Sequence, residues 1–174
     1  VMWGSKFRLY FGASLAIMDT FTDALAIVRF LRNGNEGFAL ANTSFICASL
    51  FFQCLIAYMQ HKNRGVRELS LEMFYILTFI KPAVDASRVA SGNVQLEKST
   101  FDPKTESTFN KSVEIFCESI PSALLQSYAL SKYHDKASLM AYVSIVSSIS
   151  SVAFTSTSIS FDYDTAPSKR TIAP

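Results

Sequence analysis

Acidic residues stand inside long apolar stretches of this 174-residue chain, in pairs separated by four positions. Asp19 and Asp23 lie in the first apolar stretch, and Glu114 and Glu118 repeat the spacing in the fourth. Residues four apart share one face of a helix, so each pair is expected to point in one direction. Carboxylates at membrane depth are costly, and they normally face a bundle interior, pair with a cation or line a polar path.

Basic residues that could partner these acids occur at similar helical spacing. Lys111 lies one turn before Glu114, and Lys81, Asp85 and Arg88 fall on one helix face at spacings of four and three. We expect Lys81 and Arg88 to offer the cations that the four acids lack. Two interpretations remain open: a structural ion-pair network that joins helices, or a polar track for a charged substrate or headgroup.

Other residues in the fourth and fifth stretches are expected to shape the bundle. Pro121 removes one backbone hydrogen bond and predicts a helix kink close to Glu118. Gln126 is expected to form a hydrogen bond between helices. The fifth stretch is rich in serine, which favours tight helix packing, with a hydroxyl-lined groove as the alternative.

The remaining reactive residues give little support to catalysis. His61 and His134 fall in expected loops without metal-ligand spacing, and Cys47, Cys54 and Cys117 are expected to be small buried apolar residues. The chain has no nucleotide-binding loop, zinc-protease or nucleophile-elbow motif. We therefore expect no enzyme activity, no cofactor and no metal. The basic residues are not interleaved with aromatic ones, so we expect no nucleic-acid partner.

Five apolar segments must position these residues, and they predict an all-α integral membrane protein. The chain is 49% hydrophobic and only 17% charged, whereas soluble domains have roughly 25% charged residues. The third segment carries four charged residues and Pro82, and each charge at a helix centre costs about 2.5–3.5 kcal/mol. We expect that segment to be re-entrant, interfacial or shielded by protein. The five segments are residues 9–31, 38–59, 69–90, 111–131 and 137–161.

The distribution of basic residues distinguishes two topologies. If all five segments span the membrane, seven basic residues in the loops and at the segment ends lie on the N-terminal side and six on the other. If the segment at 69–90 does not span, the division becomes ten to three. The sequence therefore predicts a bundle of four transmembrane helices plus one re-entrant or interfacial helix, with the N-terminus and the basic loop 60–67 in the cytoplasm.

The organisation along the chain is simple. Residues 1–165 are expected to form one helical transmembrane domain, which we interpret as part of a longer chain. Residues 166–174 are expected to form a flexible polar tail, and the polar residues 91–110 a loop between the third and fourth segments.

Two motifs resemble those of the XK-related family of membrane proteins. The stretch from Met18 to Asp23 (MDTFTD) is similar to the family's D-x-x-T-D motif. The stretch from Glu114 to Gln126 (EIFCESIPSALLQ) is similar to E-x-x-x-E-[ST]-x-P-Q-L-x-L-Q, with Ser122 where the family usually has glutamine. The resemblance extends over about residues 9–165. Family members are roughly twice this length, with two similar halves, and this chain resembles the first half.

The resemblance implies energy-independent movement of phospholipids between leaflets, in the plasma membrane, with intramembrane acids and bases guiding headgroups. By motif match it assigns this role to Asp19, Asp23, Lys111, Glu114 and Glu118, whereas Lys81, Asp85 and Arg88 come from spacing alone. Two alternatives remain. A non-transporting subunit would bind a partner protein through loops 60–67 and 91–110, and an ion or solute transporter would use the same acids for coupling.

Overall fold

The computed structural model describes residues 3–62, 64–92, 102–133 and 139–164, and these residues form helices without a strand. The prediction of an all-α protein is confirmed. The elements in chain order are α1 (Trp3–Arg32), α2 (Glu36–His61), α3 (Val66–Leu77), α4 (Lys81–Ala90), α5 (Pro103–Glu114), the π-helical turn η1 (Ile115–Ser119), α6 (Ile120–Lys132) and α7 (Leu139–Asp164).

Among the residues that the structure describes, three helices are long and apolar enough to cross a membrane: α1, α2 and α7. They coincide with the first, second and fifth predicted segments. Their large apolar side chains, such as Phe21, Leu40 and Phe51, point outwards. The buried side chains of the described residues are mostly polar or small. This inverted distribution suits a hydrocarbon surrounding rather than water.

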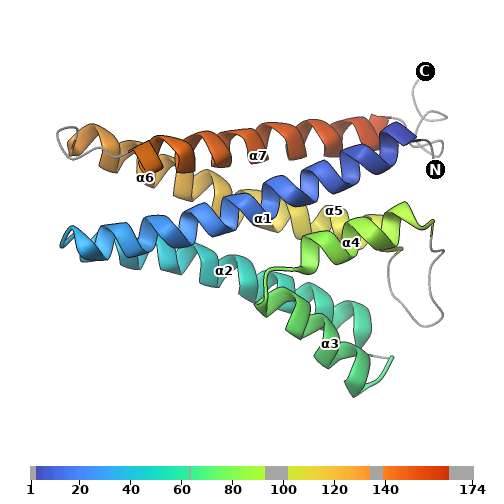
Figure 1. The fold of residues 1–174 in the computed structure, drawn as a ribbon. Coiled ribbons are helices and arrows are strands. Elements are labelled where there is room, and N and C mark those ends of the chain that lie inside the picture. Colours follow the sequence, from blue (N-terminus) through green and yellow to red (C-terminus); the bar gives the residue numbers. More distant parts are fainter. Residues whose placement is uncertain (1–2, 63, 93–101, 134–138, 165–174) are drawn as a thin grey trace.

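The helices lie roughly along one direction, with α7 beside α1 and the rod of α5, η1 and α6 against α2 (Figure 1). One end of the molecule holds the start of α1, the start of α5 and the ends of α2, α4 and α7 (Figure 1). The α1–α2 turn and the end of α6 lie at the other. Small residues allow close packing, because a Cβ on Gly12 of α1 would lie 3.2 Å from the ring of Phe154 in α7.

The segment predicted at 69–90 is two helices rather than one. Helix α3 ends at Leu77, the chain reverses over three residues, and α4 runs back from Lys81 toward the same end of the molecule (Figure 1). Pro82 lies in the first turn of α4. Backbone N–H groups in the first turn of a helix have no intrahelical acceptor, so proline costs no hydrogen bond there and favours the start of a new helix.

Several boundaries and the burial of the cysteines differ from the sequence predictions. The loop predicted at 91–110 is shorter, because Asp102 caps α5 by accepting a hydrogen bond from the Thr105 backbone N–H at 2.6 Å. His61 belongs to the last turn of α2 rather than to a loop, and α7 extends to Asp164. The cysteines are not buried as predicted: Cys47 is exposed on the outer apolar face of α2, and Cys54 and Cys117 are half-buried. The tail 166–174 and His134 lie outside the described residues.

Candidate functional site

The predicted acidic residues of α1 are fully buried, and neutral donors hold them. Asp19 accepts two hydrogen bonds at 2.6 Å, one from the hydroxyl of Ser119 in η1 and one from that of Ser148 in α7. Asp23 Oδ1 accepts a hydrogen bond from the amide of Gln126 in α6 at 2.8 Å, and Asp23 Oδ2 has no hydrogen-bond partner among the described residues. The expected interhelical role of Gln126 is thus observed, and α1 is joined to α6 and α7 through these carboxylates.

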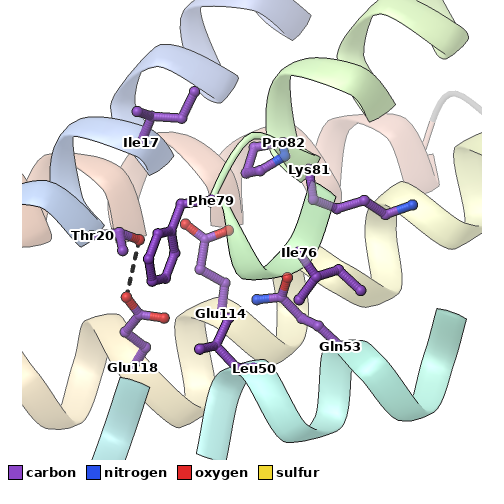
Figure 2. Close-up of a pocket in the computed structure, with 10 residues that line it drawn as sticks. All are labelled: Ile17, Thr20, Leu50, Gln53, Ile76, Phe79, Lys81, Pro82, Glu114 and Glu118. Carbon is purple, nitrogen blue, oxygen red and sulfur yellow. Dashed lines mark hydrogen bonds between the residues drawn. The ribbon is translucent and has the colours of Figure 1, made fainter. Parts of the chain in front are cut away.

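The second acidic pair faces the same region from the opposite helix rod. Glu118 Oε1 accepts a hydrogen bond from the hydroxyl of Thr20 in α1 at 3.0 Å. Glu114 lines a small cavity with Glu118 and Thr20, and Figure 2 shows its carboxyl group directed into that space. We name Asp19, Asp23, Glu114 and Glu118 the acid cluster. All four are less than a tenth exposed.

An irregular turn of backbone presents Glu118 and Ser119. The helix rod passes through the π-helical turn Ile115–Ser119 immediately before Pro121, and the Ile120 N–H bonds to the Ile115 carbonyl, five residues back. Proline cannot donate to the carbonyl of the preceding turn, so a local widening of the helix there has a direct cause. Close to Pro121, where the sequence predicts a kink, the structure has a π-helical turn that carries Glu118 of the acid cluster.

The basic residues Lys81 and Arg88 belong to a different group of side chains. The Lys81 ammonium lies 2.7 Å from Glu72 Oε2, 2.9 Å from Asp85 Oδ1 and 2.6 Å from Glu106 Oε1. Arg88 pairs with Glu72 and lies 3.9 Å from Asp85. We name these five residues the ion-pair cluster. It joins α3, α4 and α5, and Asn110 donates to Asp85 at 3.0 Å.

The electrostatics of the ion-pair cluster favour the charged forms of four of its members, whereas burial raises the pKa of Asp85. Burial opposes ionisation of the Lys81 ammonium, but the carboxylates of Asp85, Glu106 and Glu72 outweigh burial and raise its pKa. Burial likewise opposes ionisation of Glu106, yet His61 and Lys81 lower the pKa of that carboxyl to about 2. The cluster is thus a set of opposite charges that stabilise one another inside the protein.

The structure therefore separates residues that the sequence analysis expected to pair. Lys81 and Arg88 contact Glu72, Asp85 and Glu106, whereas the ion pairs found among the described residues include no member of the acid cluster. The expectation that these two cations partner the four acids is wrong in this respect. Lys111 lies between the groups and interacts electrostatically with Glu114 and Asp85.

One member of the ion-pair cluster and several residues that contact the two clusters were not identified from the sequence. Glu106 stands in a region predicted as loop, although Asp102-Pro103 just before it is a helix-start signal. His61, which is 2% exposed, lies with its Nε2 atom 3.6 Å from Glu106 Oε1. Ser119 and Ser148 are two serines among many, and nothing in their spacing marks them as donors to Asp19.

One group of side chains has the composition of a metal site. Ligand atoms of His61, Glu72 and Glu106 lie within 4.8 Å of one another. The ammonium of Lys81 lies 2.7 Å and 2.6 Å from the two carboxylates. A cation bound by all three ligands would have to displace that ammonium, so these residues fit an internal ion pair better than a metal ion.

The comparison with known proteins bears directly on this arrangement. The family model for XK-related proteins matches residues 7–163, which is most of the chain. The chain belongs to the XK-related family. A search of the curated proteins and a search of the solved structures found no match. The matched range of this XK-related protein contains both clusters and nearly all of α1, α2 and α7, the described helices that are long enough to span a membrane.

Proposed function

We propose that this XK-related protein is an energy-independent phospholipid scramblase, without enzyme activity, and that its intramembrane charges guide headgroups between leaflets. One observation carries the proposal: the acid cluster is buried in a helical membrane protein, and the described residues provide it with hydroxyl and amide donors instead of a cation at ion-pair distance. Buried carboxylates normally have a cationic partner. The ammonium group of a passing phospholipid is such a partner.

The physical requirement for scrambling supports the same assignment. A charged or zwitterionic headgroup loses its hydration when it enters hydrocarbon, and the loss costs far more than thermal energy. Side chains that offer substitute partners lower this barrier without any energy source. Lys111, near Glu114, supplies a positive charge for the phosphate part of the headgroup, next to carboxylates that suit its ammonium part.

We propose four membrane spans, with the α3–α4 hairpin entering and leaving from one side. At about 1.5 Å per residue, α3 is about 18 Å long and α4 about 15 Å, which is too short for a hydrocarbon core of about 30 Å. The fourth span is residues 111–131, within the α5–η1–α6 rod. Helix ends near Ala90, Pro103 and Asp164 lie toward the same end of the molecule as the start of α1 (Figure 1). This arrangement supports the ten-to-three division of basic residues, and on that division we propose that the N-terminus and residues 60–67 lie in the cytoplasm.

The experiment is a lipid-exchange assay on the whole protein in vesicles that carry fluorescent phospholipid in both leaflets. A membrane-impermeant reductant destroys fluorescence only in lipid that reaches the outer leaflet. We expect nearly complete loss of fluorescence with wild type. The variant with Asp19→Asn and Glu118→Gln should lose only the outer half, since it keeps side-chain shape and removes charge. Glu68→Gln in α3, where the side chain is 46% exposed, is the matched control and should behave as wild type.

The other outcomes favour other functions. If wild type stops at half and the vesicles contain folded protein, lipid scrambling is refuted under these conditions, and a subunit that binds a partner protein becomes the better explanation. If both variants scramble as wild type does, the acid cluster has a structural role. Ion-dependent flux of a small solute, lost in the same double variant, would instead support a transporter. Measuring exchange in cells would also test the proposed plasma-membrane location.

A further inference from the structure

The reversal between α3 and α4 contains a phenylalanine in a conformation that usually belongs to glycine. Phe79 has φ of 58°, and it is the one non-glycine residue with positive φ in the part of the chain that the structure describes. A left-handed conformation is rare for a bulky side chain and is destabilising relative to glycine. A strained residue of this kind persists when the surrounding structure or function requires its side chain.

The backbone of the reversal explains why the conformation itself is needed. The Phe79 N–H bonds to the Ile76 carbonyl at 3.0 Å, and the Ile80 N–H bonds to the Tyr75 carbonyl at 3.0 Å. These two bonds are those of a Schellman motif, in which the residue at the position of Phe79 adopts the left-handed conformation and is most often glycine. The hairpin therefore requires positive φ at this position, but it does not require a ring.

The ring of Phe79 lies at the cavity of the acid cluster. It lines that cavity with Thr20, Glu114 and Glu118, and Figure 2 shows it beside the hydrogen bond between Thr20 and Glu118. Phe79 and Ile17 are 38% and 37% exposed. Glu114 and Glu118 are buried, at 8% and 3% exposed. The cavity thus has two acids in its interior and two apolar side chains at its outer rim.

We propose that Phe79 is the gate of a lateral opening through which a phospholipid headgroup reaches the acid cluster from the bilayer. The inference rests on the proposed function and adds a positioning residue to it. An apolar ring at the rim keeps water and headgroups away from Glu114 and Glu118 while it is in place. The ring must turn away for a headgroup to enter, so its size sets the frequency of entry.

The test compares Phe79→Gly, Phe79→Trp and wild type by two measurements. The first is the rate at which a water-soluble thiol reagent modifies Thr20→Cys in vesicles, in a protein whose native Cys47, Cys54 and Cys117 are alanine. The second is lipid exchange. Phe79→Gly should increase both rates at least about threefold, and Phe79→Trp should lower both. Phe74→Ala is the matched control, because Phe74 is an exposed ring of the same hairpin that does not line the cavity.

The thermal midpoint separates a gate from a packing role. Glycine suits positive φ, so Phe79→Gly should have a midpoint close to that of wild type. A large fall in the midpoint, or an unchanged rate of Thr20→Cys modification, would overturn the proposal. If Phe79→Gly speeds the modification of Thr20→Cys but neither wild type nor any variant exchanges lipid, the gate is supported and scrambling is refuted. If Phe79→Gly leaves the modification rate of Thr20→Cys unchanged while wild type exchanges lipid normally, the gate is refuted and scrambling is not.

Discussion

Replacing Lys81 by methionine tests whether the ion-pair cluster holds the α3–α4 hairpin in place. Lys81 is 1% exposed, and its ammonium lies within 2.9 Å of carboxylate oxygens from Glu72, Asp85 and Glu106. Methionine keeps a similar unbranched shape and removes the charge. The three carboxylates would then stay buried, and only Arg88 and His61 would be close enough to compensate their negative charge.

The expected cost follows from what the substitution leaves behind. Removing one partner of a buried ion pair costs about 3–5 kcal/mol, because the other charge remains without compensation. For a chain of this size, each kcal/mol lowers the thermal midpoint by about 2–4 °C, so the midpoint of Lys81→Met should fall by about 6–20 °C. The assay is thermal unfolding in a mild detergent, followed by the loss of monodisperse protein on size-exclusion chromatography.

A double variant separates loss of the ion pair from loss of packing. The double variant Lys81→Met with Glu106→Gln also removes one of the carboxylates that lost its partner. Its loss of unfolding free energy should therefore be smaller than the sum of the losses in the two single variants. The reasoning is refuted if Lys81→Met lowers the midpoint by less than about 2 °C, or if the two effects simply add. Either result would mean that the hairpin does not depend on this contact.

Three further predictions use contacts of the same structure. Because the pKa of Glu106 falls to about 2 in the folded protein, from an ordinary value of 4.5, its stabilising contribution is complete above about pH 4.5 and is lost as the pH falls toward 2; thermal midpoints measured across that range, in wild type and Glu106→Gln, check this. Ser148→Ala leaves Asp19 with one donor fewer and should cost about 1–3 kcal/mol, whereas Ser147→Ala, whose buried hydroxyl has no hydrogen-bond partner, should change the midpoint little. Asp102→Ala removes the cap of α5 and should cost about 1 kcal/mol, while Asp102→Asn should retain most of the stability in the same assay.

The long helices could be predicted from the sequence because hydrocarbon imposes a length on apolar segments. An uninterrupted apolar run of more than twenty residues has few alternatives to a helix that spans a membrane. The inward orientation expected of Asp19 and Glu118 follows for a similar reason, since a carboxylate cannot face lipid at low cost. These are properties of single segments, and they do not depend on which helices are neighbours.

Pairing between segments could not be predicted in the same way. Lys81 could reach Asp85 on its own helix, but its contact with Glu106 depends on how α4 packs against α5. The reversal at Phe79 was also invisible, because the residue type that marks a left-handed helix end is glycine and this chain has phenylalanine there. Asp102-Pro103 did contain a usable signal, an N-cap residue followed by proline, for a helix that the polar composition concealed.

Because the two clusters are separate, the structural ion-pair network and the polar track can both be present, each in its own set of residues. A structural network and a polar track were alternatives for one set of residues, yet the charges fall into two sets with different compensation. In the ion-pair cluster, Lys81 and Arg88 face three carboxylates at contact distance, which is the arrangement of a fixed internal scaffold. In the acid cluster, hydroxyl and amide donors stabilise Asp19, Asp23 and Glu118, and none of these three carboxylates has a cation at ion-pair distance among the described residues. Lys111 interacts with Glu114 without forming an ion pair at contact distance. A site that binds cationic groups only in passing needs this second arrangement, because a permanent internal cation would compete with each one that arrives. Variants of Lys81 should therefore reduce folding, and variants of Asp19 or Glu118 that keep shape should reduce transport in protein that still folds.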